Sequence, residues 1–313
     1  MVNKTQQVII GTRGSRLALW QAEWVKTELC RLHKGFEVSL KIIKTRGDKI
    51  VDVPLAKVGG KGLFVKEIED ALLHGEADLA VHSMKDVPMY LPDGLHLSAL
   101  CRREDPRDAF ISVRYKNLAE LPSRAVVGTS SLRRACQLLH FRSDLAISQL
   151  RGNVDTRLNK LKSGQFDAIV LAVAGVQRLG FGDMITDIPG PDVLLPAVGQ
   201  GCIGIECRAD DERIASLTAG LNHEPTSVCV RAERAFLRKL EGGCQIPIAA
   251  HGRIEDNSLV LEGLVGSVDG RSIIREKIAA TLQQEDPETL GLRLAQILID
   301  RGADRILEIT DGI

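Results

Sequence analysis

Ile-Ile-Gly-Thr-Arg-Gly-Ser, at residues 9–15, joins a short apolar run to a segment whose apolar residues recur at helical spacing. Residues 8–11 therefore predict a strand, and Ser15 is placed to cap a helix that continues to about Leu32. A similar stretch, Ala-Val-Val-Gly-Thr-Ser-Ser, occupies residues 125–131 and also leads into a predicted helix. The two stretches predict two α/β lobes of similar topology, with a chance likeness between common turns as the alternative.

Other segments fit two such lobes. Residues 64–73 carry the apolar spacing of a short helix. The buried-strand pattern Asp-Leu-Ala-Val-His-Ser at 78–83 is echoed by Asp-Ala-Ile-Val-Leu-Ala at 167–172. The charged segment 102–107 suits a hinge strand, and residues 199–205 predict a strand that returns to the first lobe.

The pattern changes after about residue 222. A predicted helix at 226–240 precedes alternating segments at 248–254, 259–267 and 273–281, and a last helix follows Pro287. Runs of strands and helices of this kind indicate an α+β domain. The sequence thus predicts an α/β fold with two lobes around a cleft and a C-terminal α+β domain. The predicted division is residues 1–101 with 202–220, residues 102–201, and residues 221–313.

Composition argues against several classes of protein. The 313 residues include 41 basic and 41 acidic ones and only 4% aromatics, which disfavours nucleic-acid binding by net charge or base stacking. The first residues run directly into a predicted strand without room for a signal peptide, and no apolar run is long enough to cross a membrane. Seven cysteines without Cys-x-x-Cys spacing fit a reducing compartment and indicate no metal site. We therefore expect a cytoplasmic protein that binds no metal, membrane or nucleic acid.

One cysteine has an unusual setting, in Glu-Gly-Gly-Cys-Gln-Ile-Pro at residues 241–247. The glycines and the proline predict a turn that exposes the thiol of Cys244 and holds it in place. A thiol presented in this way is typical of a nucleophile or an attachment point, and a loop cysteine that merely packs is the alternative. The other six cysteines lie mostly among apolar residues, so we interpret them as core residues.

Basic residues gather at the predicted turns of both lobes. Unpaired backbone N–H groups and the helix dipole favour anions where a helix begins, and the planar fork of arginine suits carboxylates. A position on the solvated surface is a sufficient explanation for any one of these cations. It explains the whole set less well, because a protein of zero net charge has concentrated its cations at these turns. We therefore expect a polyanionic small-molecule ligand. The set comprises Arg13, Lys57, Lys61 and Lys85 in the first lobe, and Arg133, Arg134, Arg151, Arg157 and Arg178 in the second.

Two more segments belong to the first lobe. Residues 58–64, Val-Gly-Gly-Lys-Gly-Leu-Phe, lack the spacing of a nucleotide-binding loop and fit a glycine-rich lid instead. Val-His-Ser-Met-Lys-Asp-Val-Pro, at residues 81–88, ends a predicted strand with Lys85 and Asp86 at its carboxyl edge. Sheets of this class place their chemistry at that edge, whereas a structural ion pair is the alternative role for Asp86.

Four segments together resemble one family, the porphobilinogen deaminases, which are also called hydroxymethylbilane synthases. They are residues 81–88, residues 128–134, Leu-Arg-Gly-Asn-Val-Asp-Thr-Arg at 150–157, and the loop at 241–247. The likeness extends over essentially the whole chain, with the motifs in the family's order and no departure at any motif position. It implies three domains, of which the first two are built like periplasmic binding proteins.

The resemblance also implies an activity. Members of the family join four porphobilinogen molecules head to tail, with loss of ammonia at each addition, and release the linear tetrapyrrole hydroxymethylbilane by hydrolysis. The chain grows on a dipyrromethane cofactor that is joined by a thioether to the loop cysteine, here Cys244. This implies a monomeric transferase of haem and porphyrin biosynthesis, whose product passes to uroporphyrinogen III synthase.

The family pattern also implies roles for individual residues. Asp86 matches the catalytic aspartate, a buried carboxylate that stabilises positive charge on the pyrrole as ammonia leaves, and Lys61 and Arg13 are expected in catalysis too. Because every ring carries two carboxylates, six rings bring about twelve negative charges, which accounts for the many cations. Cofactor binding is expected, besides Cys244, of Ser83, Lys85, Asp86, Arg103, Thr129, Ser131, Arg133, Arg134 and Arg157. Substrate binding is expected of Arg13, Ser15, Phe64, Arg151, Arg157 and Arg178, with Lys57 and Lys61 in the lid.

Two other functions remain as alternatives. A solute-binding module shares the predicted two-lobed anion cleft, but it normally carries an export signal and needs neither Cys244 nor Asp86. A cysteine hydrolase would use Cys244 with His251 as its base, yet the sequence offers no evident acid to orient that histidine. Detection of a covalent pyrrole adduct on the purified protein separates these functions from the deaminase.

Overall fold

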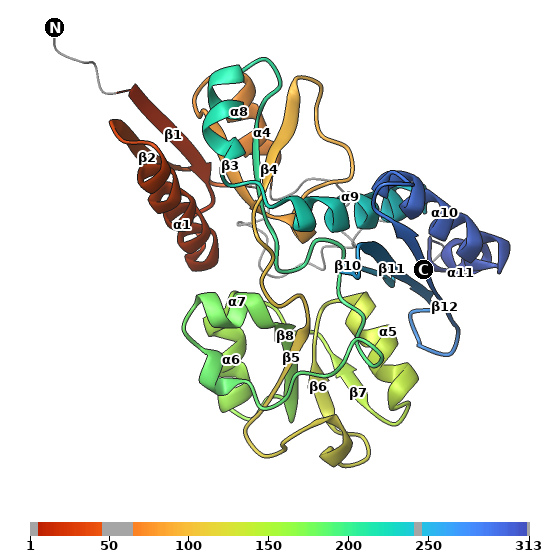
Figure 1. Cartoon of the computed structure of the whole chain (residues 1–313). Helices are drawn as coiled ribbons and strands as arrows, with labels where there is room; N and C mark the ends of the chain where they lie inside the picture. The colour runs from red at the N-terminus through yellow and green to blue at the C-terminus, as the bar shows by residue number, and fades with distance from the viewer. Residues whose placement is uncertain (1–5, 46–64, 241–245, 312–313) are drawn as a thin grey trace, which may run out of the picture. The chain divides into compact units, whose positions relative to one another are not determined.

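The computed structural model describes residues 6–45, 65–240 and 246–311 (Figure 1). The chain divides into two compact units, Met1–Arg103 with Cys202–Ser227, and Glu104–Gly201 with Val228–Ile313. The first unit contains one sheet and the second contains two. The division into three domains at the boundaries given above stays a prediction.

The first lobe is built on a five-stranded sheet in the order β2-β1-β3-β9-β4. β1 pairs in parallel with β2 and β3, whereas β9 is antiparallel to both of its neighbours. β9 therefore joins this sheet from a distant part of the sequence, as predicted for the returning strand. The strands are β1 (Gln6–Thr12), β2 (Phe36–Ile42), β3 (Leu79–Ser83), β4 (Leu95–Leu100) and β9 (Ile203–Arg208), and the helices are α1 (Arg16–Leu32), α4 (Lys66–Leu73), the 3-10 turn η1 (Met84–Asp86) and α8 (Glu212–Ala219).

Local sequence explains how α1 begins and which face it buries. The Ser15 hydroxyl accepts a hydrogen bond from the Ala18 N–H at 3.3 Å, so the predicted N-cap and helix bounds are confirmed. Ala22, Val25 and Leu29 recur at helical spacing and pack against the sheet. Trp20 and Trp24, which have the same spacing, pack against this core as partly buried residues.

The second lobe repeats this plan in a four-stranded sheet of order β5-β8-β6-β7. β6 pairs in parallel with β7 and β8, as β1 does with β2 and β3, and β5 lies antiparallel beside β8 as β9 does beside β3. The repeat predicted from the sequence is therefore confirmed by topology. The elements are β5 (Asp108–Ser112), β6 (Val126–Gly128), β7 (Ala146–Ser148), β8 (Ala168–Ala172), α5 (Leu132–Phe141), α6 (Val154–Lys162), α7 (Val173–Arg178) and the 3-10 turns η2 (Leu118–Glu120) and η3 (Gly182–Met184).

The C-terminal region has an antiparallel sheet in the order β10-β11-β12, with helices packed on it (blue in Figure 1). Phe236, Leu261 and Leu294 form part of its core, and Gly291 allows two helices to approach closely, because a Cβ there would lie 2.2 Å from the Ala232 carbonyl oxygen. The predicted fold class, two α/β lobes and a C-terminal α+β domain, is confirmed. The elements are α9 (Glu224–Lys239), β10 (Ile248–Glu255), β11 (Ser258–Gly266), β12 (Ile273–Thr281), α10 (Pro287–Asp300) and α11 (Ala303–Asp311).

Five of the six cysteines predicted to lie in the core are buried, and Cys30 is exposed on α1. Burial raises the pKa of the Cys136 thiol to about 12, and the charge of Asp269 adds to this effect. A thiol of such high pKa remains protonated and is therefore a poor nucleophile. The prediction that these cysteines pack in the core is thus confirmed for the five buried ones, and for Cys136 the raised pKa also argues against reactivity.

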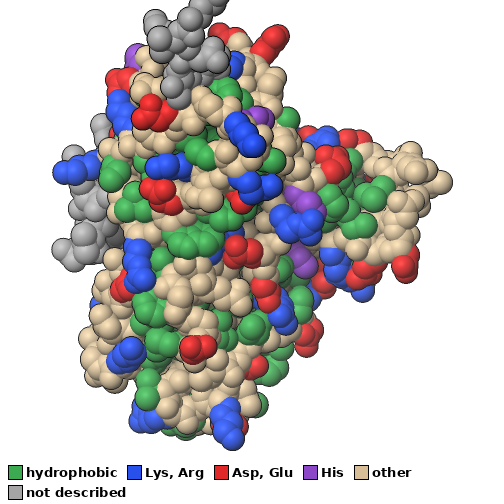
Figure 2. All heavy atoms as spheres, turned by 60° about the vertical axis from the view of Figure 1, so that its left-hand side comes forward, with side chains coloured by type: hydrophobic (Ala, Val, Ile, Leu, Met, Phe, Trp, Pro, Cys, Tyr) green, Lys and Arg blue, Asp and Glu red, His purple; other side chains and the backbone are tan. Residues whose placement is uncertain are grey.

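The surface shows mixed charge. Acidic and basic side chains are interspersed over the face shown in Figure 2, as expected from 41 residues of each sign. Within the described ranges of the chain, no helix combines the length and the apolar character that spanning a membrane requires.

Candidate functional site

The second lobe places two arginines directly after a strand-to-helix turn. β6 ends at Gly128, and the turn that follows leads to Ser131, the residue before α5. The Thr129 hydroxyl accepts a hydrogen bond from the Ser131 N–H at 3.2 Å, and the Ser131 side chain makes no capping bond. Arg133 and Arg134 lie in the first turn of α5, where the helix dipole favours anions.

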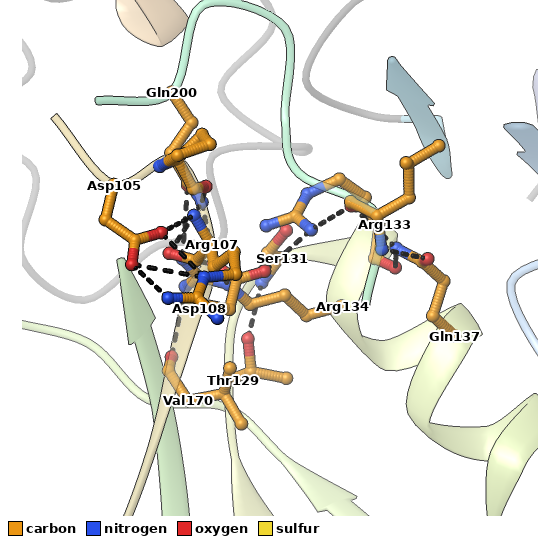
Figure 3. Close-up of polar contacts among 12 residues, drawn as sticks. Asp105, Arg107, Asp108, Thr129, Ser131, Arg133, Arg134, Gln137, Val170 and Gln200 are labelled. Carbon is orange, nitrogen blue, oxygen red and sulfur yellow. Dashed lines mark hydrogen bonds and ion pairs between the residues drawn. The ribbon is translucent and has the colours of Figure 1, made fainter. Parts of the chain in front are cut away.

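Both arginines bind one buried carboxylate, Asp108, at the start of β5 (Figure 3). Arg134 donates from Nε and Nη2 to Oδ1 of Asp108, at 3.0 and 2.7 Å, and Nη1 of Arg133 lies 2.8 Å from Oδ2. Asp108 is fully buried, and Arg133 and Arg134 are only 5% and 6% exposed. Two guanidinium groups and one carboxylate therefore leave one positive charge within this buried cluster.

The pKa values of the cluster reflect this imbalance. Burial alone would raise the pKa of Asp108, but the charges of Arg133 and Arg134 and their hydrogen bonds outweigh it and hold that pKa far below its usual value. Burial lowers the pKa of Arg133, Asp108 opposes this effect, and the neighbouring charge of Arg134 adds to it. An added carboxylate would relieve the repulsion between the two cations, so the cluster fits an anionic group.

Neutral groups hold the arginine cluster in place. Gln200 donates from Nε2 to Asp108 Oδ1 at 2.9 Å and to the Pro106 carbonyl at 2.7 Å. Arg133 and Gln137 both donate to the Leu195 carbonyl, at 2.6 and 3.2 Å. Because Gln200 and Gln137 are themselves buried, the guanidinium groups are held by side chains that are also fixed by packing.

The remaining predicted residues of the second lobe occupy different settings. Thr129 is buried, and Arg157 is half-buried with its Nε donating to the Gly152 carbonyl at 2.7 Å. Arg178 is 8% exposed at the end of α7, where its Nε lies 3.2 Å from Glu104 and its Nη2 donates to the Gly201 carbonyl at 2.9 Å. The expectation that these cations lie at strand-to-helix turns is therefore wrong for Arg178, which is the last residue of a helix.

In the first lobe, β3 leads directly into η1, which carries Lys85 and Asp86. The Met84 side chain is fully buried beneath Gly204, where a Cβ would lie 2.2 Å from its sulfur atom. This buried methionine turns Asp86 outward, and Asp86 is exposed. The expectation of a buried catalytic carboxylate is therefore wrong for Asp86 in this structure.

Other predicted residues of the first lobe lie near strand ends. Ser83 ends β3, and Arg13 and Ser15 follow β1; all three are half-buried, as are Lys85 and Arg103. β1 and β3 are parallel neighbours, so their carboxyl ends lie at one edge of the sheet. The structure thereby brings Arg13 and Ser83 to the same edge of the first lobe.

A second buried polar cluster lies in the first lobe. His82 Nε2 is 2.8 Å from Glu206 Oε2, and both side chains are buried. Burial raises the pKa of Glu69 in α4 to about 7, and the charge of Glu206 adds to the effect whereas His82 opposes it. These residues have no assigned role in the predicted reaction.

Some predictions fall outside the described residues. Lys57, Lys61 and Phe64 belong to residues 46–64, and Cys244 belongs to residues 241–245. The predicted lid and the predicted attachment point therefore stay predictions. Within the described part of the chain, no three His, Cys, Asp or Glu side chains are grouped to hold a metal ion.

The sequence-based prediction missed several buried acids, namely Asp108, Glu206, Glu233 and Glu69. Asp108 had a usable signal, because an acid directly before the apolar run Ala109-Phe110-Ile111 must find a cation or a hydrogen-bond donor once the strand is buried. Glu206 likewise interrupts an apolar strand. Neither signal identifies the partner, which comes from another segment.

Three comparisons place the chain among known proteins. The profile described as porphobilinogen deaminase, dipyromethane cofactor binding domain, matches residues 8–216, and that of the porphobilinogen deaminase C-terminal domain matches residues 227–300. The porphobilinogen deaminase of Syntrophotalea carbinolica is 57% identical over 302 residues, which cover 96% of this chain and 95% of that protein.

Solved structures of binding proteins are also similar. A methionine-binding lipoprotein of Bacillus subtilis, described as putative, has a TM-score of 0.40 at 13% identity and covers 68% of this chain and 88% of its own. A periplasmic substrate-binding protein of an ABC transporter from Coxiella burnetii has a TM-score of 0.43 at 14% identity, with 68% and 91% covered.

The family profiles and the identity over almost the full length exclude the solute-binding module and the cysteine hydrolase as alternatives. The chain belongs to the porphobilinogen deaminase family, the dipyrromethane-dependent transferases that polymerise porphobilinogen into hydroxymethylbilane in tetrapyrrole biosynthesis.

Proposed function

We propose that Cys244 carries the dipyrromethane through a thioether and that the Arg133–Asp108–Arg134 cluster of the second lobe binds its carboxylates. The observation that carries the proposal is the single positive charge left by two buried guanidinium groups on one buried carboxylate. A buried excess charge is costly, and an anionic ligand offsets that cost. The Ser131 hydroxyl, which does not cap α5, and the neighbouring Thr129 turn add neutral donors suited to carboxylates.

The other cofactor contacts in the proposal come from Ser83, Lys85, Asp86, Arg103 and Arg157. When bound, the dipyrromethane supplies the nucleophilic pyrrole carbon to which the first porphobilinogen is joined. The chain's own cations hold the acidic side chains and thereby orient the reacting ring. Charge-assisted hydrogen bonds from guanidinium groups give the pair of carboxylates on each ring a defined direction.

Asp86 is the proposed catalytic group. Loss of ammonia from porphobilinogen leaves an electron-poor methylene carbon whose positive charge is shared with the ring nitrogen. A carboxylate beside that N–H stabilises the charge as it develops, and it then accepts the proton that the new ring must lose. Asp86 is exposed on η1, and the buried Met84 next to it fixes that turn against β9, so the carboxylate is accessible on a rigid support.

Substrate binding is assigned to Arg13, Ser15, Phe64, Arg151, Arg157 and Arg178, with the cations and the serine taking the carboxylates. Lys57 and Lys61 belong to the lid, and Lys61 also has a catalytic role. Arg13 and Ser15 lie at the same sheet edge as Ser83, which supports an acidic substrate there. Arg178 pairs with Glu104, so a substrate carboxylate must compete with that acid for the guanidinium.

The decisive experiment is the intact mass of the purified protein with peptide mapping. We expect a mass excess of two linked pyrrole units on Cys244, and we expect Cys244→Ser to lack the excess and to be nearly inactive. Cys30→Ser is the matched control, since Cys30 is an exposed cysteine on α1 outside the proposed site. An unmodified and fully active wild-type protein would contradict the proposal.

The proposal extends to the setting in which the enzyme acts. The substrate is porphobilinogen, the product is handed to uroporphyrinogen III synthase, and the enzyme works as a monomer in the cytoplasm. On the face shown in Figure 2, charges of both signs are interspersed, which supports a protein that does not self-associate through a charged patch of one sign on that face. Sedimentation of the purified enzyme across a concentration range tests the monomer, and a concentration-dependent dimer would contradict it.

A further inference from the structure

Glu233 is a buried acid to which the reaction gives no role. It lies in α9 and is fully buried. Both of its carboxyl oxygens accept hydrogen bonds from backbone amides, Oε2 from Gly199 and Oε1 from Gly252, each at 2.7 Å. Burying a carboxyl group is costly unless such bonds satisfy it, and an apolar side chain would avoid that cost. The presence of a carboxylate at this position is therefore better explained by the segments that its hydrogen bonds join than by packing.

Two of the three joined segments flank the cofactor cysteine. α9, which carries Glu233, ends at Lys239, and β10, which carries Gly252, begins at Ile248. Cys244 lies between them in the sequence. The bond from Gly252 to Glu233 thus fastens the strand after the cysteine to the helix before it.

The third segment leads to the arginine cluster. Gly199 precedes Gln200, whose side-chain amide donates to Asp108 and accepts from Arg134, at 2.9 and 3.5 Å. Gln200 is itself buried, so this connection is rigid. Hydrogen bonds of Glu233, the peptide bond between Gly199 and Gln200, and the Gln200 side chain therefore connect both flanks of the cysteine segment to the carboxylate that holds Arg133 and Arg134.

A ligand held at two points requires a constant distance between them. A covalent bond fixes one end of the dipyrromethane, and the arginines fix its acidic side chains, so a small displacement of one anchor misaligns the other. We infer that Glu233 is a positioning residue that holds the two segments flanking residues 241–245 at a fixed distance from the arginines that bind the primer. This inference rests on the proposed function.

The test compares Glu233→Gln with Phe236→Leu, in the same helix. The Gln amide keeps one acceptor but turns an NH₂ group toward one of the backbone amides, so one hydrogen bond is lost with little change in shape. Phe236 is also fully buried, packs in the C-terminal core and makes none of these contacts, so its variant lowers stability without loosening the anchors. The readouts are the ratio of primer-carrying to primer-free protein by intact mass and the thermal midpoint.

We expect the loading ratio to fall about tenfold in Glu233→Gln. In Phe236→Leu it should stay near the wild-type value at an equal or larger loss of thermal stability. Glu233→Asp, whose carboxyl group is one methylene short of spanning both amides, should be intermediate, and it serves as the test if the Gln variant does not fold. Equal loading of the Glu233 and Phe236 variants at matched midpoints would show that Glu233 is merely structural. A wild-type protein that carries no primer would instead overturn the proposed function, and the inference with it.

Discussion

The two α/β lobes repeat one strand arrangement, yet each buries an acid at a different position along the strands of its own sheet. In each lobe an antiparallel strand lies beside a parallel one, and that antiparallel strand carries a buried acid. In the second lobe Asp108 of β5 pairs with Ala172, the last residue of β8. In the first lobe Glu206 of β9 pairs with Ala80, near the beginning of β3.

This difference in register decides what each acid contacts. At the carboxyl edge of its sheet, Asp108 meets Arg133 and Arg134 of the helix that follows the turn. In the first lobe, Glu206 lies away from the carboxyl edge and contacts His82 instead. Arg13, the basic residue in the turn after β1, remains half-buried. The same strand arrangement thus supports a buried charged cluster in the second lobe and more accessible charged side chains, such as Arg13 and Asp86, in the first. Substitutions in the Arg133–Asp108–Arg134 cluster should therefore affect stability and cofactor together, whereas substitutions of Asp86 or Arg13 should affect turnover alone.

Arg134→His should have the largest effect, because it removes a two-pronged ion pair from the interior. Loss of one partner of a buried pair destabilises by about 3–5 kcal/mol. We expect largely primer-free, heat-labile protein, because bound primer also stabilises the native state. Intact mass and thermal denaturation measure the two effects.

Arg114→His is the matched control for this prediction, since Arg114 forms an exposed ion pair with Asp167 in the same lobe. Its loss should cost no more than about 1 kcal/mol. A stable Arg134→His protein that carries a full complement of primer would contradict the role of the buried cluster in stability and in primer binding.

Asp86→Asn should have the next largest effect, and on activity only. Removal of one preorganised electrostatic group lowers kcat by about 10²–10³-fold. Because Asp86 is exposed, we expect an unchanged thermal midpoint, and the primer should be retained because the covalent bond to Cys244 and the arginine cluster still hold it. Steady-state kinetics beside intact mass test this, with the exposed Asp93→Asn as control; near-normal turnover would move the catalytic role to another residue.

Arg13→Leu should retain the primer while failing to bind or condense substrate. A carboxylate left without its charged partner gives roughly a hundredfold loss in kcat/KM. Arg31→Leu, an exposed position at the end of α1, the helix that follows the Arg13 turn, should leave kcat/KM unchanged. If Arg13→Leu lost the primer while Arg134→His kept it, the division of labour between the lobes would be reversed.

The smallest effect concerns Glu69 and the dependence of stability on pH. The pKa of Glu69 is raised from 4.5 to about 7 in the folded protein, so the folded state binds more protons than the unfolded state between these values. Its contribution to stability is therefore fully present below pH 4.5 and is lost as pH rises through about 7, a difference on the order of 2 kcal/mol. Glu69→Gln should remove this dependence, whereas Asp93→Asn, an exposed change in the same lobe, should keep it. Thermal midpoints measured from about pH 5 to pH 8 decide the matter, and parallel curves for wild type and Glu69→Gln would contradict the prediction.

Local sequence determined the elements and their repetition. The helix at Arg16–Leu32, its Ser15 cap and the helix that begins at Pro287 follow from residues within one or two turns of each other. Helical hydrogen bonds and caps join near neighbours, so spacing alone reveals them. The same holds for the repeated strand–Gly–Thr–helix stretches, which led to the two lobes, and for the motifs that indicated the family.

Tertiary structure alone decided how the charges are paired. Arg134 meets Asp108 across 26 positions of sequence, and Glu233 joins Gly199 and Gly252 across 34 and 19. The outward turn of Asp86 likewise depends on the space that Gly204 leaves for Met84. Such contacts depend on the register of an antiparallel strand that arrives from a distant part of the chain, and a shift of one residue turns every side chain to the other face. The sequence by itself therefore determined the fold class, the family and the kinds of residue at the site, and only the packing of distant strands decided which cations are buried with a partner.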